Sequence, residues 1–342
     1  MKQYIINRNE LFYPPSDKVK KAIKNFPQQK ISRYIGGYYH SPLAEKISKK
    51  FNFPSQQILI FYGLEDFFRG LFRSLDRKKD SILVNQYHFA YFSSYLKHLK
   101  IKMYESKMVS DKNSFYFDID DLIKKYKKYK PSIVLLTSPN NPTGNVLNFA
   151  DLKKVLNTVS KNTLVILDEA YFGFDPNYQD KKYINLTKKY PHLMLVRTFS
   201  KFYGLAGLRI GYALAGKQAL KIINYQAYYL NFSQILENIA IAALDSTNYY
   251  GNIAKKIIKD RDNLTEEINK LKNFIAYKSC TNFILIKVNK KILNKLKNIV
   301  AKQNFKVAMF LGEDMMRVSI TLPKYSKRFL NTLKDMDNKK IG

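Results

Sequence analysis

The chain has 342 residues, of which 46% are hydrophobic and 14% are aromatic, with 13 glycines and 11 prolines. This composition excludes a disordered, collagen-like or low-complexity chain, and the length suits one large domain and a smaller one. Lysine and arginine number 59 against 27 acidic residues, a formal net charge of +32, which by itself favours a nucleic acid or an anionic surface as partner. Arginine, the residue preferred for binding phosphate in a bidentate manner, accounts for only 10 of the 59. We therefore interpret the charge as a solvated, lysine-rich surface and expect no nucleic-acid partner.

Cysteine and histidine provide no metal-binding pattern. The single cysteine, Cys280, excludes an internal disulfide and a cysteine-based metal site. The four histidines are scattered without the spacing of metal ligands. No apolar run reaches the roughly 18 residues of a membrane helix, and the N-terminus does not read as a signal peptide. We expect a cytoplasmic protein with no metal site and no membrane partner.

In the first two thirds of the chain, apolar strands alternate with amphipathic helices. This pattern predicts an α/β fold with a mostly parallel sheet between two layers of helices. The predicted strands are 57–62, 81–84, 101–104, 132–137, 163–167, 194–198 and 210–215. The predicted helices between them are 64–75, one beginning at residue 89, 119–129 and 149–159.

After residue 215 the pattern changes to that of a smaller α+β unit. Helices are predicted over 217–228, 233–244, 252–271 and 291–303, with a further one at the end of the chain, and strands over 275–278, 283–288 and 315–320. Residues 7–16 contain Pro14 and Pro15, which exclude a long helix there. We predict an N-terminal arm over 1–30 that packs with the small domain, a large domain over 31–245 and a small domain over 246–342.

Polar motifs follow several of the predicted strands, where ligands gather in open α/β sheets. Asn141 lies in the segment SPNNPTG after strand 132–137, and its amide can donate a hydrogen bond into a site. Asp168 follows strand 163–167 in the segment DEAY, which ends at Tyr171. A carboxylate at such a strand end either caps a following helix or holds a cation such as a protonated ring nitrogen.

Three further segments complete the set. Lys201 ends the segment TFSK, and a desolvated lysine there has a lowered pKa and becomes a nucleophile toward aldehydes. Arg209 lies in the glycine-rich segment GLAGLRIG and offers a guanidinium fork for phosphate. Gly63–Glu65 opens a predicted helix, whose free N–H groups also suit a phosphate.

In this order, the motifs resemble those of the class I/II aminotransferases, which are pyridoxal-phosphate (PLP) enzymes of fold type I. The similarity covers nearly the whole chain and is greatest to the histidinol-phosphate aminotransferase branch. It is carried by the motifs above together with segments 6–10, 13–16, 33–34, 281–283 and 317–320. The resemblance implies a PLP-dependent transaminase that moves an amino group from an amino-acid donor to a small keto or aldehyde acceptor.

The resemblance also implies roles for individual residues. Lys201 carries the cofactor and moves the proton, Asp168 keeps the ring nitrogen protonated, and Asn141 and Tyr171 bind the ring's phenolic oxygen. Phe89 stacks on the ring. The residues implied to bind the cofactor phosphate are Gly63, Leu64, Glu65, Thr198, Ser200 and Arg209.

Substrate and partner subunit are implied in the same way. Arg317 binds the substrate carboxylate or an equivalent anion, and Tyr13 contributes to the substrate site. Tyr34 reaches the cofactor phosphate of a partner subunit, which implies a homodimer with shared sites.

Several positions depart from the family pattern. Leu64 and Glu65 stand where relatives have a small residue and an aspartate, and Phe89 often corresponds to tyrosine. Ala308 stands where histidinol-phosphate and threonine-phosphate enzymes tend to have an arginine that binds the substrate phosphate. Whether this chain accepts a phosphorylated substrate is therefore left open. A PLP-dependent decarboxylase of the threonine-phosphate decarboxylase type is the alternative within this chemistry. A basic nucleic-acid-binding protein is the alternative from another class.

Overall fold

The computed structural model describes residues 4–34, 41–222 and 232–338. Its centre is a seven-stranded sheet in the order β2-β10-β9-β8-β7-β3-β4. The strands are β2 (Ile58–Phe61), β3 (Ser81–Asn85), β4 (Lys102–Ser106), β7 (Ile133–Thr137), β8 (Leu164–Asp168), β9 (Leu193–Thr198) and β10 (Gly211–Ala215). Only β10 runs antiparallel to its neighbours, so the prediction of a mostly parallel sheet is confirmed.

Helices cover both faces of this sheet, because its strands are apolar on both sides. In β7, Ile133 and Leu135 face one hydrophobic cluster, whereas Val134 and Leu136 face the other. The first cluster includes α3 (Gly63–Arg73), α4 (Ala90–Leu99) and α8 (Lys217–Ile222). The second includes α2 (Pro42–Phe51), α5 (Ile119–Tyr129), α6 (Phe149–Thr158) and α7 (Asp180–Lys189). Buried on both faces, the sheet holds its strand ends in fixed positions.

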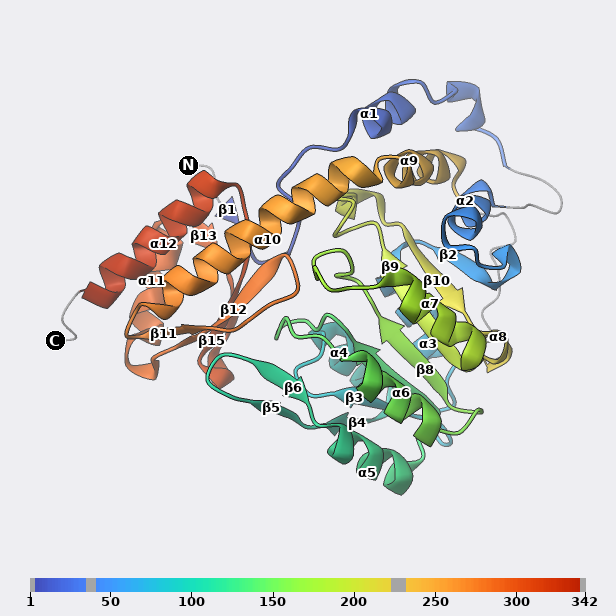
Figure 1. Ribbon diagram of the computed structural model, residues 1–342, viewed down its shortest axis with the longest axis horizontal. Helices are drawn as coiled ribbons and strands as arrows, with labels where there is room; N and C mark the ends of the chain where they lie inside the picture. The colour runs from blue at the N-terminus through green and yellow to red at the C-terminus, as the bar shows by residue number, and fades with distance from the viewer. Residues whose placement is uncertain (1–3, 35–40, 223–231, 339–342) are drawn as a thin grey trace.

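The C-terminal part contains an antiparallel four-stranded sheet in the order β11-β12-β15-β14. Its strands are β11 (Phe274–Ala276), β12 (Phe283–Val288), β14 (Ala308–Phe310) and β15 (Met315–Ser319). The accompanying helices are α10 (Thr247–Asn269), α11 (Leu293–Lys302) and α12 (Pro323–Asn338). Helix α10 follows α9 (Gln234–Leu244) and runs from beside the large sheet to the small one (Figure 1).

The N-terminal arm contacts both parts of the molecule. Strand β1 (Tyr4–Ile5) pairs in parallel with β13 (Phe305–Lys306) in the C-terminal part. Helix α1 (Asp17–Lys24) packs against α9, and the serine at its N-cap, Ser16, bonds to Ser246 with 2.8 Å between the two Oγ atoms. The segment between β1 and α1 is extended and crosses the gap between the two parts (Figure 1).

Most predicted elements lie within a few residues of their observed positions, but some short or polar elements were not predicted. Helices α1, α2 and α7 and the hairpin β5 (Met108–Ser110)–β6 (Phe115–Phe117) were missed. Of the predicted helix over 217–228, residues 217–222 form α8 and the rest lies outside the described residues. No helix in the described ranges is both long and apolar enough to cross a membrane.

Candidate active site

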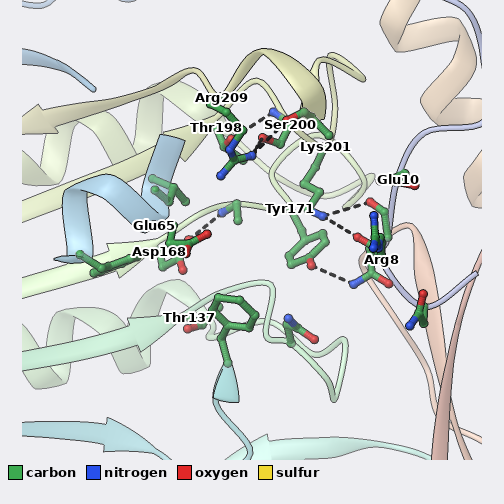
Figure 2. A pocket seen from close by; sticks show the side chains of 18 of the residues that line it. Arg8, Glu10, Glu65, Thr137, Asp168, Tyr171, Thr198, Ser200, Lys201 and Arg209 are labelled. Atoms are coloured by element: carbon green, nitrogen blue, oxygen red, sulfur yellow. Dashed lines mark hydrogen bonds between the residues drawn. The ribbon is translucent and has the colours of Figure 1, made fainter. Parts of the chain in front are cut away.

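The ends of three neighbouring strands form the floor of a cleft. Thr137 at the end of β7 lies opposite Asp168 in β8, and Asp168 lies opposite Val196 in β9. The cleft has a volume of about 720 Å³ and opens toward the N-terminal arm and β15. Eleven of the predicted site residues line it: Leu64, Glu65, Phe89, Asn141, Asp168, Tyr171, Thr198, Ser200, Lys201, Arg209 and Arg317. Figure 2 shows most of them around one space.

Asp168 is a buried carboxylate on this floor. Its Oδ1 accepts a hydrogen bond from the backbone N–H of Ala170 (3.0 Å), and no cation of the described chain forms an ion pair with it. The chain forms a turn and not a helix directly after Asp168, so the capping alternative is excluded. Burial is the main cause that raises its pKa to about 7. A cationic ligand in the cleft would form an ion pair with the Asp168 carboxylate and thereby lower its pKa.

Lys201 is a half-buried amine in the same cleft. Its Nζ donates hydrogen bonds to two carbonyl oxygens of the arm, those of Arg8 (2.9 Å) and Asn9 (3.2 Å) (Figure 2). Burial, together with the positive charges of Arg317 and Arg209, lowers its pKa to about 8. A substantial fraction of this amine is therefore neutral near pH 8, the state in which it can attack an aldehyde.

Three hydrogen bonds link the large domain, the arm and β15. The guanidinium of Arg317 donates to Oδ1 of Asn141 and to the carbonyl of Asn7, the latter at 2.6 Å. The hydroxyl of Tyr171 accepts a hydrogen bond from Nδ2 of Asn9 (2.9 Å). Asn141, Tyr171 and Arg317 are thus held together around one wall of the cleft.

At another wall, hydrogen-bond donors surround the start of α3. Gly63 has φ +80°, and a Cβ there would lie 2.9 Å from Nη2 of Arg209, so both the backbone conformation and the space favour glycine. Nη1 of Arg209 donates to the carbonyl of Ala206 (3.0 Å) and approaches Oγ of Ser200 (3.4 Å). The hydroxyl of Thr198 accepts from the N–H of Ser200 at 3.0 Å. No side chain caps the N-terminus of α3, so its first N–H groups remain available.

Two predicted residues lie elsewhere. Tyr34 is 81% exposed and lines a separate hollow with Tyr62 and Phe232. Tyr13 packs against the hydrophobic core and does not line the cleft. Phe89 lines the cleft but is 43% exposed, since no described residue covers its outer face.

The arm and β7 contribute cleft residues that no motif in the sequence predicts. Arm residues 7–10 and Thr137 all line the cleft. Asn9 is 1% exposed with a left-handed φ of 55°, and its backbone N–H donates to Oγ of Ser319 at 2.9 Å. An asparagine tolerates this conformation better than most residues, but no local pattern shows that it does so in an extended arm. Thr137 could have been found as the polar end of an apolar strand.

The chain belongs to the family of class I and II aminotransferases, whose model matches residues 3–331. Within this family, the predictions of fold type I, of PLP as cofactor and of a PLP-dependent transaminase are confirmed. Nothing in the described part of the chain gathers three or more histidine, cysteine, aspartate or glutamate side chains into a metal site.

The histidinol-phosphate aminotransferase of Pelagibacter ubique is 30% identical over 341 residues, which cover 97% of this chain and 92% of that protein. Among solved structures, the histidinol-phosphate aminotransferase of Clostridium acetobutylicum superimposes with a TM-score of 0.81 at 24% identity, covering 98% and 99% of the two chains. The L-threonine-O-3-phosphate decarboxylase of Porphyromonas gingivalis gives a TM-score of 0.79 at 18% identity, covering 98% and 100%. These two structural likenesses show the fold.

Proposed function

We propose that the protein moves amino groups between an amino-acid donor and a small keto or aldehyde acceptor, with histidinol phosphate as the first substrate to test. The observation that carries this proposal is the shared cleft of Lys201 and Asp168. The pKa of the amine is lowered to about 8 and that of the carboxylate raised to about 7, although no ion pair joins them. Because the amine and the carboxylate do not pair with each other, both remain available to a ligand.

The residues present fit PLP. When bound, PLP supplies an aldehyde that takes up amino groups and a ring that withdraws electrons. Asp168 is the free carboxylate available to a cationic ring nitrogen, and Asn141 and Tyr171 offer polar atoms for the ring oxygen. The N-terminus of α3 with Thr198, Ser200 and Arg209 forms a donor set for a phosphate dianion. Gly63 keeps space free beside Arg209.

In the reaction, the chain's own residues position groups and move protons. The neutral Nζ of Lys201 would accept the proton from the carbon that bears the substrate's amino group and act as the acid and base of the 1,3-proton shift. Arg317, fixed by Asn141 and the arm, binds the substrate's carboxylate or an equivalent anion. Overall, the donor's amine and the acceptor's carbonyl exchange places, so the water released in one half of the reaction is taken up in the other.

We further propose a cytoplasmic homodimer in which Tyr34 reaches the site of the partner subunit. The exposure of Tyr34 and its position away from its own chain's cleft support this assignment. The arm, large domain and small domain keep their proposed bounds at residues 1–30, 31–245 and 246–342. The contacts of β1 with β13 support the packing of the arm's first residues with the small domain.

The test is a spectroscopic and kinetic comparison of wild-type protein with Lys201→Ala, each purified with PLP. The wild type should absorb near the visible range, convert its bound PLP to the amine form with an amino donor, and aminate an acceptor. Lys201→Ala should lose turnover. A wild type that binds no PLP overturns the proposal, and release of carbon dioxide without conversion to the amine form assigns the decarboxylase alternative instead.

A further inference from the structure

The mouth of the cleft has an arginine, Arg8, that has no part in the proposed reaction. Arg8 lies in the arm segment that crosses the cleft, and it lines the cleft together with Glu10. Its side chain is exposed, whereas the carbonyl of the same residue accepts a hydrogen bond from Lys201. Figure 2 shows Arg8 beside the amine end of Lys201, on the side of the cleft away from Arg209, Thr198 and Glu65.

Arg8 differs from the other two arginines of the cleft in its bonding. Arg209 donates to Ala206, and Arg317 donates to Asn141 and Asn7. Within the described ranges, no hydrogen bond or ion pair fixes the guanidinium of Arg8, and the nearby Glu10 forms no ion pair with it. Arg8 is therefore the cleft arginine whose donors are all available to a ligand.

The backbone places Arg8 accurately although its side chain is free. Asn7 is held by Arg317 (2.6 Å), and the carbonyl of Asn9 accepts a hydrogen bond from Nδ2 of Asn282 (3.1 Å). The neighbouring strand β14 places Ala308 opposite Arg317 and contains no charged residue. A cation for an anionic group beyond Arg317 is thus available from the arm and not from β14.

We propose that Arg8 binds the distal anionic group of the substrate, a phosphate monoester or a second carboxylate at the end away from the reacting amino group. This inference rests on the proposed function, because it takes the Lys201 end of the cleft as the reacting end. Arg8 is then a specificity-determining residue, and dianionic amines are preferred over their singly charged or neutral counterparts. The exposed guanidinium of Arg8 offers a fork of two N–H donors to such an anion.

The experiment measures kcat/KM of the PLP-loaded enzyme for two matched pairs of amines. One pair is O-phosphothreonine and threonine, which differ in a phosphate additional to the carboxylate, and the other is glutamate and 2-aminobutyrate, which differ in the distal carboxylate. In Arg8→Gln, the preference for the anionic member should fall about tenfold to a hundredfold in the pair whose anion Arg8 binds. Arg8→Lys, which keeps the charge without the fork, should retain part of that preference.

Arg77→Gln is the matched control, since it removes an equal charge at an exposed turn outside the cleft. A loss of preference in the first pair identifies a phosphate site, and a loss in the second pair identifies a carboxylate site. The inference is overturned if Arg8→Gln and Arg77→Gln both keep the wild-type preference in each pair, or if wild type has no preference at all. A wild type that binds no PLP instead overturns the proposed function, and the absorbance of the purified protein reports this separately.

Discussion

The end of β8 separates two regions of contrasting chemistry. On the cleft side, Asp168 is buried without an ion-pairing cation in the described chain. On the opposite side, the next residue, Glu169, forms an ion pair with Arg197 (Oε2 to Nε, 2.8 Å), and both side chains are fully buried. Two adjacent carboxylates therefore lie in a low-dielectric interior, one with its counter-charge inside the protein and one without. The difference indicates that Asp168, and not Glu169, is the carboxylate available to a ligand.

The interior region is a polar network centred on Arg197. Nη2 of Arg197 also donates to Oδ1 of Asp180 (2.6 Å) and to the hydroxyl of Tyr178 (2.9 Å), which itself donates to Glu169. The guanidinium lies over the ring of Phe172, 4.7 Å from its centroid. Because this network fixes the ends of β8 and β9, it positions Asp168 and Thr198 without touching a ligand.

The same separation occurs in the loop after β7. Asn140 is fully buried and donates to Oγ1 of Thr143 (2.6 Å) and to the carbonyl of Tyr87 (2.9 Å). Asn141 instead lines the cleft and accepts from Arg317. In both pairs of adjacent polar residues, one supports the backbone and the other faces the cleft.

The largest expected effect breaks the interior network. Glu169→Gln leaves the buried guanidinium of Arg197 without its fully buried counter-charge, so we expect a loss of about 3 to 5 kcal/mol in the free energy of unfolding. Urea unfolding followed by circular dichroism measures this loss. Asp180→Asn is the matched control, because that carboxylate is 39% exposed, and it should cost about 1 kcal/mol. Equal losses for the two variants would show that burial does not distinguish them.

The next effect concerns the cleft side. Asp168→Asn replaces the unpaired carboxylate with a neutral amide, which cannot hold a cationic ring nitrogen. We expect kcat/KM with an amino donor to fall about 10²- to 10³-fold. Steady-state kinetics measures the loss, and absorbance shows whether PLP is still bound. Asp120→Asn removes a carboxylate of α5 that is 88% exposed, and it should keep wild-type kinetics. A fully active Asp168→Asn enzyme would contradict the role proposed for Asp168.

These contrasts explain how far the sequence could be interpreted. The sheet, its helical layers and the motifs at its strand ends were predictable, because hydrophobic periodicity and turn residues are local signals. Lys201, Asp168, Asn141 and Tyr171 were therefore identified with their strands. The contribution of the arm to the cleft could not be predicted, because Asn9 bonds to Tyr171 across 162 residues of sequence. Likewise, the adjacent residues Asp168 and Glu169 do not by themselves show which carboxylate faces Arg197, because the register of the strand determines this.

The smallest expected effect is a pH dependence of the cofactor-free protein. The pKa of Asp168 is about 7 in the folded protein and ordinarily 3.8, so between these values the folded state holds a proton that the unfolded state has released. The free energy of unfolding contributed by this group therefore falls as pH rises through that window. Asp168→Asn lacks this titration, so its stability relative to wild type should rise by on the order of 2 kcal/mol from pH 5 to pH 7.

Urea unfolding of both proteins without PLP, at pH 5, 6 and 7, measures this gap. Bound PLP should reduce it, because a cationic ring nitrogen stabilises the ionised carboxylate of the wild type and not the amide. Parallel curves for wild type and variant across the window would mean that Asp168 is ionised in the empty cleft. Its counter-charge would then have to come from the protein, and the contrast with Glu169 would disappear.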